Sequence, residues 1–248
     1  MNVMKAFIRQ QTTRNGRRHR SISHNNVRKQ RGFHMKQNNR VIVSFIAFFL
    51  LNTSSALAAD EKTIKLGANI YAQNCIFCHQ ADAIGKPGFA PSLSNPEFLS
   101  LVTDKFILGT IRDGRVGTGM PPFAHIGRDQ GRAIVAYLRS FEKLPHRAAE
   151  IDAQPAASGD TAQGKQLFDD ICSTCHGPNG DGYVAGGTGT AIGKAGTLNK
   201  VSDGFLRTTI KEGRSNTRMR GFAGPEGLAN LSDQDIDNII TYLRTLAK

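Results

Sequence analysis

The chain has 248 residues, with 32 Lys and Arg against 20 Asp and Glu, which is a formal net charge of +12. The charge is uneven, because the first 59 residues contain 11 of the basic residues and no acidic residue, whereas the remainder has 21 basic and 20 acidic side chains. A nucleic-acid-binding domain carries a basic surface of its own, so this distribution excludes a nucleic-acid partner for the folded part.

The N-terminal segment has the pattern of an export signal. An apolar run of 11 residues (41–51) follows two cations and precedes an A-x-A cleavage site at 56–58. The run is shorter than the roughly 20 residues of a membrane-spanning helix. We therefore expect a signal peptide over 35–58, starting at Met35, export to the periplasm, and no membrane anchor. Residues 1–34 are then an untranslated or disordered basic extension, and an uncleaved anchor is the alternative for the apolar run.

Two pentapeptides, CIFCH at 75–79 and CSTCH at 172–176, begin two similar stretches 97 residues apart. Downstream, DKFILGTIRDGR (104–115) matches DGFLRTTIKEGR (203–214), and each copy ends in an apolar segment containing Tyr-Leu-Arg. A repeat of this length indicates two copies of one domain.

We expect one domain over 60–145 (the first repeat), a linker over 146–157, and a second domain over 158–248 (the second repeat). The linker is rich in Ala, Pro, Ser and charge, and apolar periodicity stops there. Apolar residues otherwise recur at helical spacing, most clearly after Ser232, which is a good N-cap, and no strand alternation is visible. The fold class is therefore all-α. Domains this small need stabilisation beyond their hydrophobic core, which a covalently bound cofactor can provide.

The Cys-x-x-Cys-His pattern is typical of covalent haem attachment. Residues three apart lie on one side of a helical turn, so both thiols can reach the vinyl groups at one edge of a haem, and the next residue lies under the iron. We expect two covalently bound haems c, with His79 and His176 as iron ligands. The cysteines expected to attach them are Cys75, Cys78, Cys172 and Cys175.

Two other uses of paired cysteines remain open at this point. Two pairs can form a Cys₄ zinc site, and one pair can be a thioredoxin-like redox centre. Neither use requires a histidine after each pair, and no βαβ pattern surrounds the motifs.

Only two methionines follow the export signal, and both fall at the same place in the repeat. Met120 lies 41 residues after His79, and Met219 lies 43 residues after His176. A thioether is a soft ligand that raises the reduction potential of haem iron. We expect both methionines as sixth iron ligands, with His125 as a rival in the first repeat. Iron closed on both sides leaves no place for a small-molecule substrate.

The loops around the methionines differ, because the first reads GTGMPPF and the second NTRMRGF. Two arginines beside Met219 disfavour ferric iron, whereas a less rigid loop weakens the iron–sulfur bond. We therefore expect unequal reduction potentials for the two haems.

With CIFCH and GMPPF in one repeat and CSTCH and TRMRGF in the other, the chain resembles class I cytochromes c, and its layout is similar to that of periplasmic dihaem cytochromes with two such domains. The resemblance covers everything except the leader and the linker. It implies that the first and last helices of each domain cross near the haem. The residues expected at these crossings are Gly67, Tyr71 and Tyr137 in the first repeat, and Gly164, Phe168 and Tyr242 in the second.

The resemblance also implies a proline whose carbonyl accepts the second N–H of the axial histidine. Pro91 fits this role in the first repeat, and Thr190 is its counterpart in the second. Arg115 and Arg214, at matching places before each methionine, either pair with haem propionates or are solvated.

The function that follows is electron transfer between a redox-protein donor and acceptor, as a free carrier or as the cytochrome subunit of an oxidoreductase, with no catalytic residues. The alternative is a haem enzyme, such as a dihaem peroxidase or a thiosulfate dehydrogenase. A peroxidase needs an iron that can open, and a thiosulfate dehydrogenase would need a fifth cysteine as ligand. A haem-based sensor would likewise need a weak sixth ligand.

Overall fold

Helices account for all the regular structure in residues 61–247, the part of the chain that this computed structural model describes, and they are joined by loops with three isolated bridges and no strand. The all-α prediction is confirmed. The predicted signal peptide and basic extension lie outside the described residues. Within residues 61–247, no helix is long and apolar enough to cross a membrane.

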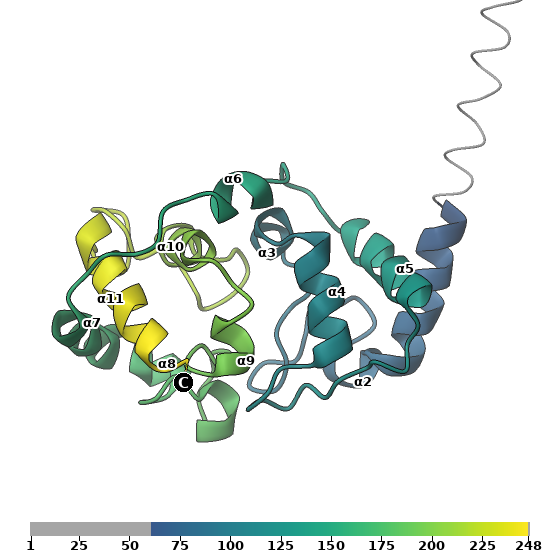
Figure 1. Cartoon of the computed structure of the whole chain (residues 1–248), viewed down its shortest axis with the longest axis horizontal. Coiled ribbons are helices and arrows are strands. Elements are labelled where there is room, and N and C mark those ends of the chain that lie inside the picture. Colours follow the sequence, from purple (N-terminus) through teal and green to yellow (C-terminus); the bar gives the residue numbers. More distant parts are fainter. Residues whose placement is uncertain (1–60, 248) are drawn as a thin grey trace, which may run out of the picture. The chain divides into compact units, whose positions relative to one another are not determined.

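Residues 61–74 form the first described helix, and shorter helices follow (Figure 1). In the first repeat these are α2 (Ile76–His79), α3 (Pro96–Leu101), α4 (Asp104–Asp113) and α5 (Arg128–Arg139), and α6 (Ala148–Asp152) follows them. The second repeat contains α7 (Thr161–Leu167), the π-helical turn η1 (Phe168–Cys172), α8 (Ser173–His176), the 3₁₀ turn η2 (Gly182–Ala185), α9 (Ala195–Leu198), α10 (Asp203–Glu212) and α11 (Asp233–Thr245).

The first and last helices of each repeat approach each other at a glycine. A Cβ atom on Gly67 would lie 1.9 Å from the backbone oxygen of Ala133 in α5. In the second repeat, a Cβ atom on Gly164 of α7 would lie 1.9 Å from the backbone oxygen of Asn238 in α11. Only glycine allows the two backbones to come this close, and α7 and α11 accordingly lie side by side (Figure 1).

Aromatic rings pack beside each crossing. The ring centroids of Tyr71 and Tyr137 are 5.2 Å apart, and those of Phe168 and Tyr242 are 5.4 Å apart, both in tilted arrangements. The predicted helix crossings are therefore confirmed, and Tyr71 and Phe168 are almost completely buried.

The arginine of each Tyr-Leu-Arg segment joins the last helix to the start of an earlier one. Arg139 donates from Nε to Asp104 (2.8 Å), and from its two terminal nitrogens to the carbonyls of Leu99 (2.7 Å) and Val102 (2.6 Å). Arg244 makes the matching contacts with Asp203, Leu198 and Val201. Leu99 and Leu198 lie in the last turns of α3 and α9, so each arginine satisfies a carbonyl that a helix terminus leaves unpaired.

The connecting segment 146–157 contains helix α6, which packs on both repeats. The backbone N–H of Arg147 donates to the carbonyl of Ser100 (2.8 Å), and the Arg147 guanidinium pairs with Glu212. A Cβ atom on Gly204 of α10 would lie 1.9 Å from the backbone oxygen of Ile151, which is buried. The segment is thus ordered and makes close contacts with both repeats.

Helix α11 begins with a capping box, as the sequence around Ser232 predicts. The Ser232 hydroxyl accepts from the backbone N–H of Asp235 (3.2 Å), whose carboxylate accepts from the backbone N–H of Ser232 (3.0 Å). We expect Ser232→Ala to lower the free energy of unfolding by about 1 kcal/mol. Ser232→Thr keeps the hydroxyl and should remain within a few tenths of a kcal/mol. Equal values for the two variants in chemical denaturation would contradict this role of the cap.

Candidate haem sites

In the first repeat, one continuous helical segment holds the CIFCH residues. The helix over 61–74 leads into α2, with the N–H of Cys75 donating to the carbonyl of Tyr71 (2.8 Å) and the N–H of His79 donating to that of Cys75 (2.9 Å). Both thiols are partly buried, and the His79 side chain is buried. The turn places Cys75, Cys78 and His79 within one short element, as thioether attachment and iron ligation require.

The His79 ring is oriented by a backbone carbonyl. Its Nδ1 lies 2.9 Å from the carbonyl oxygen of Pro91, which can only accept, so Nδ1 carries the proton and Nε2 keeps its lone pair. Burial lowers the pKa of His79, and the charge of Arg115 acts in the same direction. The imidazole is therefore neutral at neutral pH, which is the form that binds a metal.

The second repeat builds the same arrangement on η1 and α8. His176 is buried, and its Nδ1 lies 2.7 Å from the carbonyl oxygen of Thr190, so threonine stands where the first repeat has proline. Burial lowers the pKa of His176 as well, with the charge of Arg214 acting in the same direction. The backbone carbonyl, and not the proline ring, is the feature that the two sites share.

Gly189 lets the loop carrying Thr190 approach the His176 ring. A Cβ atom at position 189 would lie 2.6 Å from Nδ1 of His176, closer than real Cβ contacts allow. We expect Gly189→Ala to displace the imidazole and to weaken its hydrogen bond to Thr190. A less basic imidazole stabilises ferric iron less, so the reduction potential of the second haem only should rise, as seen in a spectroelectrochemical titration. Gly109→Ala, whose Cβ would meet nothing within 4 Å, is the control and should change neither potential. A Gly189→Ala protein with both potentials unchanged would contradict this.

The thiols of Cys75 and Cys172 do not have the lowered pKa of a redox-active pair. All four cysteines are free, and burial raises the pKa of Cys75 to about 11 and that of Cys172 to about 12. A reactive Cys-x-x-Cys thiol has a lowered pKa, so the thioredoxin-like alternative fits poorly. The two cysteine pairs stay apart, and residues 61–247 contain no group of three or more His, Cys, Asp and Glu placed to share a metal ion. The Cys₄ zinc alternative therefore also fits poorly.

Each methionine lies in a tight loop closed by the same hydrogen bonds. The N–H of Arg115 donates to the carbonyl of Met120 (3.0 Å), and that of Arg214 donates to the carbonyl of Met219 (2.6 Å). Both methionines are partly buried. The second loop is thus closed in the same way as the first, although arginine replaces proline beside its methionine. The rival ligand His125 is exposed, with its ring 5.8 Å from that of Phe123.

A threonine two residues before each methionine completes these loops, and it was not among the predicted site residues. The Thr118 hydroxyl donates to the carbonyl of Arg115 (2.8 Å) and accepts from the N–H of Met120 (3.2 Å). Thr217 makes the same pair of bonds in the second repeat, at 2.8 and 3.0 Å. The signal was present in the sequence, since threonine occupies the same place in both copies.

The donor sets at the two sites fit a c-type haem. Each site offers two thiols within one helical segment and a buried imidazole whose Nε2 is free. One more observation points to an anionic group, because Nε of Arg214 is buried and makes no hydrogen bond. Haem propionates carry the charge that such a nitrogen requires.

Comparison with known proteins identifies a cytochrome domain in each repeat. A family model described as cytochrome c matches residues 161–247, and one described as cytochrome c oxidase, cbb3-type, subunit III, matches residues 62–138. The cbb3-type cytochrome c oxidase subunit CcoP of Rubrivivax gelatinosus is 30% identical over 225 residues, which are 88% of this chain and 66% of that protein. CcoP of Azospirillum brasilense is 29% identical over 195 residues, 73% of this chain and 61% of that protein.

The chain spans less than two thirds of the length of these relatives. A solved structure, a reducing HAO-like protein complex of Kuenenia stuttgartiensis, is similar with a TM-score of 0.45 and 20% identity over 74% of this chain and 96% of that one. The two family matches, one in each repeat, agree with the duplicated Cys-x-x-Cys-His sites and the all-helical fold. The chain is therefore a class I c-type cytochrome with two tandem domains and two covalently bound haems c.

Proposed function

We propose that this protein passes electrons between protein partners in the periplasm through two haems, each ligated by histidine and methionine, and that its electron acceptor is a cytochrome c oxidase of the cbb3 type. The observation that carries the proposal is the duplication of one arrangement of side chains and backbone hydrogen bonds. In both repeats a backbone carbonyl holds the histidine Nδ1, and a hydrogen-bonded loop presents the methionine.

The chain's own residues define what the sites can do. Cys75 and Cys78 attach one haem, and Cys172 and Cys175 attach the other. His79 with Met120 would hold the iron of the first haem, and His176 with Met219 would hold that of the second. When bound, haem iron supplies one-electron chemistry, and this ligand set leaves no vacant position for a substrate.

The hydrogen bonds around each site limit structural change during electron transfer. The Pro91 and Thr190 carbonyls fix the two imidazole rings, and the two threonine-closed loops fix the methionine backbone. A ligand set that moves little between oxidation states favours fast outer-sphere transfer, because little has to reorganise when the charge changes.

We propose unequal potentials for the two haems. Prolines follow Met120, whereas Arg218 and Arg220 flank Met219. Both arginines are exposed, so water and salt screen their effect and the difference should be moderate. A potentiometric titration that fits two separate one-electron components agrees with this, and a single component for both haems would contradict it.

The choice of partner rests on the relatives, whose names describe them as subunits of cbb3-type oxidases. In a stopped-flow experiment, the reduced, haem-loaded chain is mixed with a purified cbb3-type oxidase in the presence of oxygen. We expect reoxidation far faster than that of the chain alone. Reoxidation at the same rate with and without the oxidase would contradict the proposed acceptor.

A further inference from the structure

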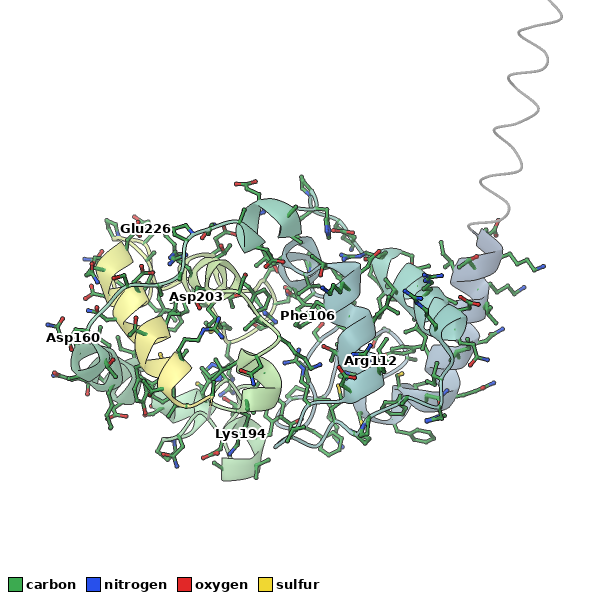
Figure 2. All side chains as sticks on the ribbon, viewed as in Figure 1. Phe106, Arg112, Asp160, Lys194, Asp203 and Glu226 are labelled. Carbon is green, nitrogen blue, oxygen red and sulfur yellow. The ribbon has the colours of Figure 1, made fainter. Side chains whose placement is uncertain are left out.

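The two repeats meet at matching positions. Phe106 of α4, labelled in Figure 2, stacks on its counterpart Phe205 of α10, with 6.3 Å between ring centroids and 27° between ring planes. Nη1 of Arg115 donates to the hydroxyl of Thr197 in the second repeat (3.2 Å). In the opposite direction, the guanidinium of Arg214 lies 5.3 Å from the ring centroid of Phe98 in the first repeat. We call these six residues the junction.

Neighbouring backbone contacts show the same reciprocity. The side chain of Asn95 donates to the carbonyl of Ser215 (3.1 Å), and the N–H of Ser215 donates to the carboxylate of Glu97 (3.1 Å). On the other side, Gly196 fits so closely that a Cβ atom there would lie 2.4 Å from the backbone nitrogen of Val116. The segment after each Gly-Arg pair thus packs on the helix before α4 or α10 of the other repeat.

Both junction arginines lie over aromatic rings and have no carboxylate partner among the described residues. Arg115 lies 5.3 Å from the ring centroid of Phe106, and Arg214 lies 5.5 Å from that of Phe205. Neither forms a salt bridge within 4.0 Å, and Nε of Arg214 is buried without a hydrogen-bond partner. Glu97, which acts on Arg214 from a distance, accepts hydrogen bonds from Ser215 instead.

Two neighbouring cations without counter-charges are costly inside a protein, because burial removes water and the like charges repel each other. Other partly buried arginines of the chain, such as Arg139, Arg207 and Arg244, are paired with carboxylates. The two junction arginines therefore need an anion, and none of the described side chains supplies it. The backbone N–H of each arginine also donates to the carbonyl of the methionine in its own repeat, Met120 or Met219, so the anion belongs near both sites.

We propose that Arg115 and Arg214 form one anion-binding junction between the two repeats, which would bind a propionate of each haem and so couple the two haems for electron transfer between them. The proposal rests on the haem positions proposed above. Guanidinium groups match carboxylates in a bidentate geometry, and propionates are the carboxylates that a c-type haem brings to a site.

The test is a potentiometric titration of the haem-loaded variants Arg115→Gln, Arg214→Gln and the double variant. Loss of a cation stabilises ferric iron, so each single variant should lower the potential of the haem in its own repeat. We expect about a tenfold fall in the ratio of reduced to oxidised haem at fixed potential, which is 59 mV for one electron. The two components are assigned with Met120→Ala, which should move only the first haem.

The double variant tests whether the two arginines share one junction. Shifts that depart from the sum of the single shifts indicate coupling through common ligands, whereas strictly additive shifts, each confined to one haem, would contradict a shared site. Arg132→Gln is the control, because Arg132 forms only an exposed pair with Asp129 and should change neither ratio by more than twofold.

Lysine variants separate charge from packing. Arg115→Lys and Arg214→Lys keep the cation, so they should load both haems and hold potentials near those of the unchanged protein. Glutamine variants with unchanged potentials would overturn the proposal and leave the arginines as packing groups on the phenylalanine rings. If a glutamine variant fails to load haem, its lysine variant decides. A tenfold fall in the ratio of reduced to oxidised haem in that lysine variant would also overturn the proposal.

The two proposals fail in different ways. The ferric protein with methionine-ligated iron shows a weak long-wavelength sulfur-to-iron charge-transfer band. Its absence from the unchanged protein would contradict the methionine ligands and still leave the arginine-dependent potentials measurable.

Discussion

Gly164→Ala is expected to destabilise the second repeat by about 3 kcal/mol or more, because the new Cβ would lie 1.9 Å from the backbone oxygen of Asn238. The nearest atoms are main chain, so no side-chain rotation can relieve the clash, and α7 and α11 must separate. Residues beside this crossing, such as Phe168 and Tyr242, then lose packing.

Gly109→Ala is the matched control for this substitution. Gly109 lies inside α4, and a Cβ atom there meets nothing within 4 Å. The variant should be more stable by about 0.5–1 kcal/mol, because alanine loses less backbone entropy in a helix. Both are measured by chemical denaturation of the haem-loaded protein. A Gly164→Ala protein as stable as the control would show that the two backbones are not in contact.

Met120→Ala is expected to lower the reduction potential of the first haem by a few hundred mV, on the scale of the roughly 0.8 V over which axial ligands set haem potentials. Loss of the thioether removes the ligand that favours ferrous iron. It also opens a coordination position, so the reduced variant should bind carbon monoxide at one haem while the second haem is unchanged.

His125→Ala is the control for the methionine prediction, since His125 is the rival ligand five residues later. Its exposed ring packs only beside Phe123, so its removal should alter neither the potential nor carbon monoxide binding. The opposite result would assign the sixth ligand to the histidine. In that case His125→Ala would allow carbon monoxide to bind, and Met120→Ala would change neither the potential nor carbon monoxide binding.

The helix crossings were predicted from the resemblance to class I cytochromes c, and the glycine and aromatic residue before each cysteine pair marked where they occur. The capped final helix was predicted by local signals, namely Ser232 with two acidic residues after it. The structure confirms both features. The iron ligands and the domain limits remain predictions, although each predicted histidine has the carbonyl acceptor that its role requires.

Other features could not be predicted because they depend on pairs far apart in the chain. Asn95 and Ser215, which share a hydrogen bond, are 120 residues apart in the sequence. Phe106 stacks on Phe205, but nothing in the sequence of either helix indicates which of its faces packs against the other helix. Helix α6 was missed because an alanine-rich segment with a proline has the composition of a linker whether or not it packs. In this chain the side chain of Ile151 is buried and anchors helix α6.

Carbon monoxide binding to the reduced, haem-loaded protein at neutral pH tests the central claim most directly. If Met120 and Met219 close both irons, the absorption spectrum will not change on addition of the gas, and electron transfer is the only chemistry that the sites allow. A carbon monoxide spectrum from either haem would show an open or labile iron, and would contradict the account in favour of a haem enzyme or a ligand sensor.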